Sequence, residues 1–240
     1  MISKVIRKIY LLCKVYKLII FVNARRGKAV KNSYKPVYIP TEIITKMIND
    51  QNSSDYRFYN QKFMIRKFGL IQKGEWDIDL FNISSLPILE LFQERFIEKL
   101  NWENTNYYKK LIEKFKLNGT RRGCKSLEEY YEKNFNRWEK IYLNIKENGY
   151  KTQKELGNIS VYEIEVCISR HGDVIFVDGR HRLCMAKILN IKEIPVIINM
   201  WHYEFIVLFK NENRDKELNN KNLVEFLLNF NERRKRKYEL

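Results

Sequence analysis

Apolar and polar residues follow two different periods in the second half of the chain. Residues 162–168 alternate strictly, which is the pattern of a strand with one buried face. Residues 174–177 are continuously apolar and residues 193–200 are mostly apolar, which predicts buried strands, and a helix is predicted over 181–190 between them. The order helix, strand, strand, helix, strand therefore predicts a compact α/β unit over residues 126–205.

Three earlier segments have helical spacing. Ser126 begins a capping-box spacing and a long helix that is predicted to end before Gly149. Pro87 opens a second amphipathic helix, and a third is predicted over residues 105–116. We interpret the apolar stripes of these helices as core.

The region 35–125 is predicted to add strands and helices that pack on this core unit. A short strand is expected to end at Pro40, and Thr41 is expected to cap a helix that runs through Asn49. A strand or hairpin is predicted over residues 62–72.

The N-terminal residues 1–34 predict a basic amphipathic helix. Ile2, Ile6, Ile9, Cys13, Tyr16 and Ile20 share one face, and lysine and arginine side chains cover the other. The basic residues interrupt every apolar run before it reaches about 18 residues, so the helix should not cross a bilayer. Two alternatives remain: residues 2–22 lie on an anionic membrane surface, or the helix packs on the protein.

Residues 206–240 predict a C-terminal helix and a basic tail, in which five basic residues follow one another from Arg233 to Lys237. Such a run is usually solvated and frayed, and the alternative is binding to nucleic acid or anionic lipid. The formal net charge of +16 favours an acidic partner, but nucleic acid, lipid and nucleotides all satisfy it.

The four cysteines are widely spaced and form neither a CxxC motif nor a cluster with histidine. This spacing predicts no disulfide partner and no structural zinc site. A reducing, cytoplasmic location is therefore expected, with peripheral placement at the membrane as the alternative.

The segment Asp178–Arg182 concentrates candidate chemistry where the strand over 174–177 runs into the next helix. The first N–H groups of a helix have no partner within it and lie at the positive end of its dipole. Arg180, His181 and Arg182 add cationic or titratable side chains there. The junction therefore predicts a phosphate-binding helix N-terminus.

This junction and its context resemble the ParB/sulfiredoxin-like superfamily. The resemblance rests on NIKENGYKTQKEL (144–156), a pair of strands, and VDGRHRLCMAKILNIKEIPVIIN (177–199). Upstream, IQKGEWDIDLF, FQERFIEKLNWENTNYY and GCKSLEEYY resemble an uncharacterised subgroup that is often associated with surface-glycan genes. The resemblance implies an α/β (α+β) fold, with a small mixed sheet and flanking helices, to which the N-terminal helix is an extension.

The superfamily includes CTP-hydrolysing DNA-segregation proteins, ATP-dependent sulfiredoxins and kinases that act on free serine. The resemblance therefore implies a bound nucleotide, ATP, CTP or ADP, with Mg²⁺. Sulfiredoxins have a catalytic cysteine where this chain has Arg180, which argues against sulfinic acid reduction. Segregation proteins continue into a DNA-binding helix-turn-helix module, for which the residues after Trp201 are too few.

We assign candidate roles on these grounds. The nucleotide-binding residues are Lys151, Gln153, Gly179, Arg180, His181 and Arg182, of which Lys151 and Gln153 rest mainly on the resemblance. The candidate catalytic residues are Glu165 as general base, Asp178 as metal ligand or helix cap, and His181 for acid or base chemistry. Arg121 and Arg122, or Trp201 and His202, are weaker candidates for the acceptor side.

The leading hypothesis is a nucleotide-dependent phosphotransferase, a kinase or NTPase, that acts on a small or glycan hydroxyl acceptor. The alternatives are a ParB-like nucleic-acid-binding protein and a nucleotide-controlled switch at the membrane surface. Neither alternative needs catalysis.

Overall fold

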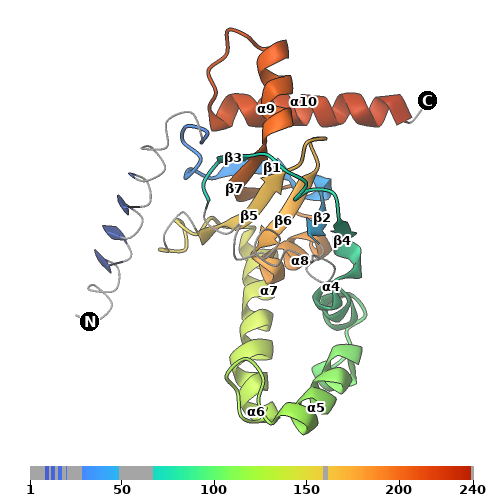
Figure 1. Cartoon of the computed structure of the whole chain (residues 1–240). Coiled ribbons are helices and arrows are strands. Elements are labelled where there is room, and N and C mark those ends of the chain that lie inside the picture. Colours follow the sequence, from blue (N-terminus) through green and yellow to red (C-terminus); the bar gives the residue numbers. More distant parts are fainter. Residues whose placement is uncertain are drawn as a thin grey trace.

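A mixed seven-stranded sheet forms the centre of the protein, with helices around it (Figure 1). This computed structural model describes residues 29–48, 67–158 and 162–238, together with seven N-terminal helical positions: 9, 10, 12, 13, 16, 17 and 20. The mixed sheet with flanking helices confirms the predicted α/β class.

The strands come from both halves of the chain. They are β1 Val37–Pro40, β2 Ile44–Ile48, β3 Leu70–Gln72, β4 Leu80–Asn82, β5 Ile164–Ile168, β6 Val174–Asp178 and β7 Glu193–His202. Their order is β1-β7-β5-β6-β2-β4, and β3 pairs with the last residues of β7. Strands β5 and β7 are parallel, whereas β6 is antiparallel to β5 and parallel to β2. The three strands predicted over 162–200 are confirmed.

The helices surround the sheet on several sides. They are α4 Pro87–Phe92, α5 Asn106–Asn118, α6 Leu127–Tyr130, α7 Asn136–Asn148, α8 Arg180–Ile188, α9 Tyr203–Glu212 and α10 Asn220–Tyr238. In the view of Figure 1, α4 to α8 lie below the sheet and α9 and α10 lie above it. Two π-helical turns, Gln93–Ile97 and Tyr131–Phe135, follow α4 and α6, so the long helix predicted from Ser126 contains a π turn.

The helix predicted from Thr41 to Asn49 is wrong. Thr41–Ile43 form one 3-10 turn, and β2 follows directly, with Ile44 and Ile48 buried. Isoleucine and threonine dominate this segment, and β-branched side chains favour a strand that packs between two neighbours. Because β1 pairs with β7 and β2 pairs with β6, the region 35–125 builds part of the same sheet as residues 126–205.

Helix α9 was not predicted, and the expected boundary at residue 206 falls inside it. His202 caps the helix, because its Nδ1 accepts a hydrogen bond from the backbone N–H of Glu204 at 3.2 Å. Phe205 and Phe209 are one turn apart and fully buried. This apolar pair was a helical signal in the sequence.

The two faces of the sheet carry separate hydrophobic clusters. The larger cluster joins Ile164, Val166 and Ile198 to helix residues such as Leu183 and Leu223. The smaller cluster lies on the other face and contains Cys167, Ile175, Val177 and Met200 under Trp76. Both faces of β5, β6 and β7 are therefore covered, which agrees with the apolar runs of β6 and β7. The alternation in β5 predicted one buried face, which is wrong, because Glu165 and Cys167 on the second face are buried as well.

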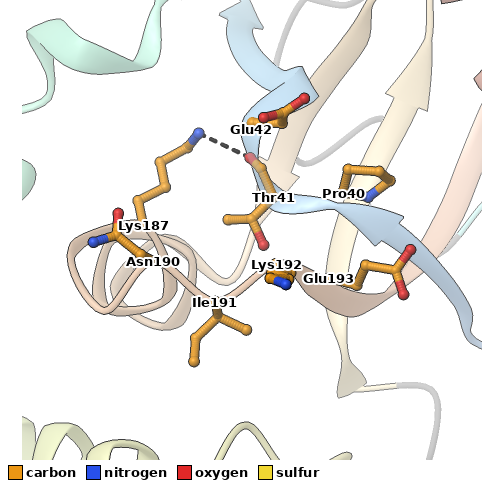
Figure 2. Close-up of a pocket in the computed structure, with 8 residues that line it drawn as sticks. All are labelled: Pro40, Thr41, Glu42, Lys187, Asn190, Ile191, Lys192 and Glu193. Atoms are coloured by element: carbon orange, nitrogen blue, oxygen red, sulfur yellow. Dashed lines mark hydrogen bonds between the residues drawn. The ribbon is translucent and has the colours of Figure 1, made fainter. Parts of the chain in front are cut away.

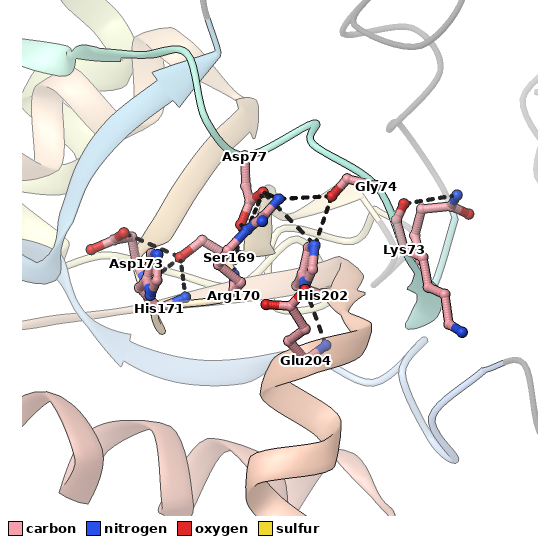
Figure 3. A network of polar contacts seen from close by, with 10 residues as sticks. Lys73, Gly74, Asp77, Ser169, Arg170, His171, Asp173, His202 and Glu204 are labelled. Carbon is pink, nitrogen blue, oxygen red and sulfur yellow. Dashed lines mark hydrogen bonds and ion pairs between the residues drawn. The ribbon is translucent and has the colours of Figure 1, made fainter.

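A buried ion pair holds the segment after β3 against the turn between β5 and β6 (Figure 3). Arg170 donates to Asp77 through Nε, Nη2 and its backbone N–H, at 2.7 to 3.0 Å for the closest atom pairs. Arg170 Nη2 and His202 Nε2 also share the carbonyl oxygen of Gly74, each at 2.8 Å. His202, considered above for the acceptor side, is therefore part of the framework, and Trp201 is buried in the core.

The basic tail continues α10 to Tyr238, in place of the expected frayed end. Four of its cations form ion pairs within the chain: Arg233 with Glu212, Arg234 with Asp173, Lys235 with Glu42, and Arg236 with Glu232. These pairs reduce the charge that the tail presents to nucleic acid. Nucleic-acid binding stays a prediction.

The N-terminal helix is described at seven positions only, all of which are helical and exposed. Ile9, Leu12, Tyr16 and Ile20 each expose more than half of their surface. The other residues of 1–28 lie outside the described residues. Residues 29–34 form isolated β-bridges and a turn, so the helix predicted over 1–34 is wrong for this part. In the described parts of the chain, no helix is both long and apolar enough to span a membrane. Membrane-surface binding stays a prediction.

Candidate functional site

The junction between β6 and α8 depends on a glycine. Gly179 has a φ of +93°, and a Cβ there would lie 3.1 Å from the Cα of Ile164. The conformation and the close approach both require glycine. Asp178 accepts a hydrogen bond from the N–H of Gly179 at 2.8 Å, which fixes the turn, and α8 begins with Arg180.

A cavity of about 620 Å³ lies beside this junction. Gly179, His181 and Arg182 line it from the start of α8, Arg137 lines it from α7, and Arg122 lines it from the loop before α6. None of the described residues that line it is an aspartate or a glutamate. Three guanidinium groups in a lining without a carboxylate favour an anionic ligand.

His181 is held between an aromatic ring and an arginine. Its ring stacks on Trp138, with centroids 4.8 Å apart, and its Nε2 lies 3.4 Å from Nη1 of Arg122. A guanidinium can only donate, so Nε2 accepts this hydrogen bond and the proton resides on Nδ1. Burial lowers the pKa of His181 to about 4, and the positive charges of Arg122 and Arg180 act in the same direction. The imidazole is therefore neutral at neutral pH.

The lowered pKa of His181 predicts an acid-sensitive contribution to stability. The unfolded chain takes up the proton near pH 6.5 and the folded protein only near pH 4, so stability falls as the pH falls through this window. The wild type should lose about 2 kcal/mol relative to His181→Gln between pH 6.5 and about pH 4.5, allowing for partial exposure. Urea denaturation of both proteins measures the difference. A difference that does not change with pH would contradict this assignment.

A buried glutamate, Glu163, orients Arg182. The sequence did not identify Glu163 as a site residue. Glu163 Oε1 accepts the backbone N–H of Gln153 at 2.5 Å, and Glu163 Oε2 lies 3.6 Å from Nη1 of Arg182. Burial raises the pKa of Glu163 despite this cation. Neither Oε2 of Glu163 nor Nη1 of Arg182 has a hydrogen-bond partner within the described structure. The ion pair therefore orients Arg182 without using all of its donors.

The other predicted nucleotide-binding residues are divided between two places. Lys151 and Gln153 line a smaller cavity of about 320 Å³, and Gln153 also lines the larger one. Arg180 is half-buried at the start of α8 and does not line either cavity. Its charge nevertheless lowers the pKa of His181. Of the two loop arginines, Arg122 reaches the larger cavity and Arg121 does not.

Glu165 lies outside the site. It is 2 % exposed and accepts a hydrogen bond from Nδ2 of Asn199 in β7. Neither cavity beside α8 is lined by Glu165. Its placement suits a buried structural partner of Asn199 better than the general base predicted from the sequence.

Asp178 supplies a single carboxylate near the site. Its exposed side chain fixes the turn through Gly179. The described residues contain no group of three or more His, Cys, Asp or Glu side chains that is arranged to hold a metal ion. A magnesium ion would therefore need phosphate oxygens as further ligands, which is its usual mode of binding with nucleotides.

A separate cavity of about 720 Å³ lies between the end of β1 and the end of α8 (Figure 2). Lys187 and Lys192 line it together with Glu42 and Glu193, so its charges balance. Burial lowers the pKa of Lys187, and its Nζ donates to the carbonyl oxygen of Thr41 at 2.9 Å. This lysine is engaged by the backbone, and the cavity shows no preference for an anion.

Arg137 and Trp138 were missed as site residues because they belong to a helix whose apolar stripe we interpreted as core. Trp138 is indeed buried, but one face of its ring meets His181. No family model, no curated protein and no solved structure matches this chain.

Proposed function

We propose that the protein binds a nucleotide, ATP, CTP or ADP, with its phosphates in the cavity beside α8. The observation that carries this proposal is the convergence of Arg122, Arg137 and Arg182 on a cavity whose described lining contains no carboxylate. The N-terminus of α8 adds unpaired backbone donors and the positive end of its dipole. The ParB/sulfiredoxin-like resemblance of the same segment supports a nucleotide as the source of these phosphates.

Each cationic residue has a distinct part in this proposal. Arg182, oriented by Glu163, makes a planar, charge-assisted contact to a phosphoryl oxygen. Arg122 and Arg137 are exposed and neutralise the outer phosphates. Neutral His181 donates from Nδ1 or remains a support for Arg122, and a bound anion raises its pKa.

Phosphoryl transfer to a small or glycan hydroxyl group is the reaction that we propose for this site. Such a reaction requires positioning and charge neutralisation, which the arginines provide. Asp178 ends β6 one residue before the cavity and is the carboxylate that would hold Mg²⁺ brought in with the nucleotide. The magnesium ion would supply further charge neutralisation on the phosphates.

A thermal-shift screen with ATP, CTP, ADP and GTP, each with Mg²⁺, tests nucleotide binding. A ligand that binds only the folded protein raises its melting temperature, by about 2.7 kcal/mol of added stability at 100 times its dissociation constant. We expect at least one nucleotide to raise the melting temperature in a concentration-dependent way. Absence of a shift with every nucleotide at millimolar concentration, confirmed by equilibrium dialysis, would refute the proposal.

A further inference from the structure

Two cavities with different linings adjoin at Arg182. The cavity of about 620 Å³ and the cavity of about 320 Å³ share five lining residues: Arg137, Ile141, Gln153, Leu156 and Arg182. Lys140 and Lys151 also line the smaller cavity, so both linings are cationic. Only the larger cavity is lined by Gly179 and His181 at the N-terminus of α8, so the anionic part of a ligand that fills both belongs there, with Arg182 between the two parts.

The smaller cavity has an apolar wall. Ile141 and Ile145 line it from α7, and Tyr150 and Leu156 line it from the segment that follows. Contiguous apolar side chains favour a ligand group that gives up water easily, such as an aromatic ring or a hydrocarbon.

Polar groups at this wall restrict the choice between a ring and a hydrocarbon. Gln153 Oε1 accepts a hydrogen bond from Nδ2 of Asn158 at 3.0 Å, so the amide nitrogen of Gln153 is the group left to donate. Asn144 adds a second amide to the lining. The hydroxyl of Tyr150 is buried beside Arg182, and burial raises its pKa to about 12, so it stays protonated.

We infer that the smaller cavity holds the base of the nucleotide, between α7 and residues 150–156. A planar base offers apolar faces to Ile141 and Leu156 and ring nitrogens or exocyclic groups to the amides of Asn144 and Gln153. A hydrocarbon chain would leave these amides without partners, which costs affinity. This inference rests on the proposed function, because the phosphates must occupy the larger cavity.

Comparison of a nucleotide with its phosphate part alone tests the inference. Calorimetric titrations of the full chain with ATP, CTP, inorganic triphosphate and geranyl diphosphate should rank one nucleotide at least about tenfold tighter than the other two ligand types. Gln153→Leu keeps the backbone N–H that Glu163 accepts and should weaken nucleotide binding about tenfold. Asn144→Leu changes an amide that lines the smaller cavity and not the larger one, so it should weaken nucleotide binding and leave the affinity for inorganic triphosphate at the wild-type value.

A matched pair of leucines provides the second arm. Leu156→Ser changes the wall of the cavity, whereas Leu143→Ser changes an exposed leucine of α7 that does not line either cavity beside α8. Only Leu156→Ser should weaken nucleotide binding, and circular dichroism melting should show both variants folded.

Three outcomes separate this inference from the proposed function. Equal affinity for inorganic triphosphate and every nucleotide would overturn the base site and leave phosphate binding intact. Tighter binding of geranyl diphosphate than of any nucleotide would overturn it in favour of an isoprenoid. Failure of every phosphate compound to bind the folded protein would overturn the proposed function itself.

Discussion

Replacing Arg122 and Arg137 together by alanine should weaken nucleotide binding about 100-fold, which corresponds to about 3 kcal/mol for two charge-assisted contacts. Both side chains line the cavity beside His181, and both residues are exposed, so their removal should leave the fold unchanged. An Arg182→Ala variant would be harder to interpret, because removal of this side chain would also leave Glu163 buried without a cation. Isothermal titration calorimetry of the double variant measures the loss.

Arg121 is the matched control for this experiment. It is exposed in the same loop as Arg122 but does not line the cavity. Arg121→Ala should bind nucleotide as the wild type does, apart from a small loss of long-range attraction that salt screens. Equal losses in Arg121→Ala and in the double variant would mean that general positive charge, and no defined cavity, accounts for the binding.

Asp77→Ala should lower the free energy of unfolding by about 3 kcal/mol, because it removes one partner of a buried ion pair. Burial alone would raise the pKa of Asp77, but the hydrogen bonds from Arg170 outweigh it and hold this pKa below its usual value. The variant leaves Arg170 with one carbonyl acceptor, Gly74, in a site where its side chain is only 20 % exposed. Equilibrium denaturation in urea gives the change.

Asp79→Ala is the control for the stability experiment. It removes the same side chain two positions along the same segment, where the residue is exposed, and exposed substitutions usually change stability by less than about 0.5 kcal/mol. A loss below about 1 kcal/mol in Asp77→Ala would contradict the structural role assigned to the pair. The segment after β3 would then be held to the sheet mainly by Trp76.

Local sequence patterns predicted much of the fold. The alternation and the apolar runs of residues 162–200 identified three central strands, and Gly149 marked the end of α7. The pattern of apolar residues did not predict the structure of residues 41–49, because a short apolar segment is compatible with either a helix or a strand. This segment is a strand because it pairs with β6 and β4, which are distant from it in the sequence.

The candidate site was predictable only where its residues are adjacent in sequence. Gly179, His181 and Arg182 belong to one turn, whereas Arg122 and Arg137 reach it only after the chain has folded. The π turn Tyr131–Phe135 also changes the face on which later residues of the long helix lie, which a regular α-helical period does not reveal. Glu163 and Glu165 are two residues apart and fall on the same face of the alternating pattern, and only tertiary contacts place Glu163 beside Arg182 and Glu165 beside Asn199.

A crystal structure of the protein with a bound nucleotide would show whether the phosphates lie in the cavity beside α8. We expect phosphoryl oxygens within about 3 Å of the guanidinium of Arg182 and of backbone amides at the start of α8, with Arg122 and Arg137 in contact with the outer phosphates. A nucleotide bound elsewhere, for example in the cavity of Lys187 and Lys192, with the cavity beside α8 filled only by water, would contradict this expectation.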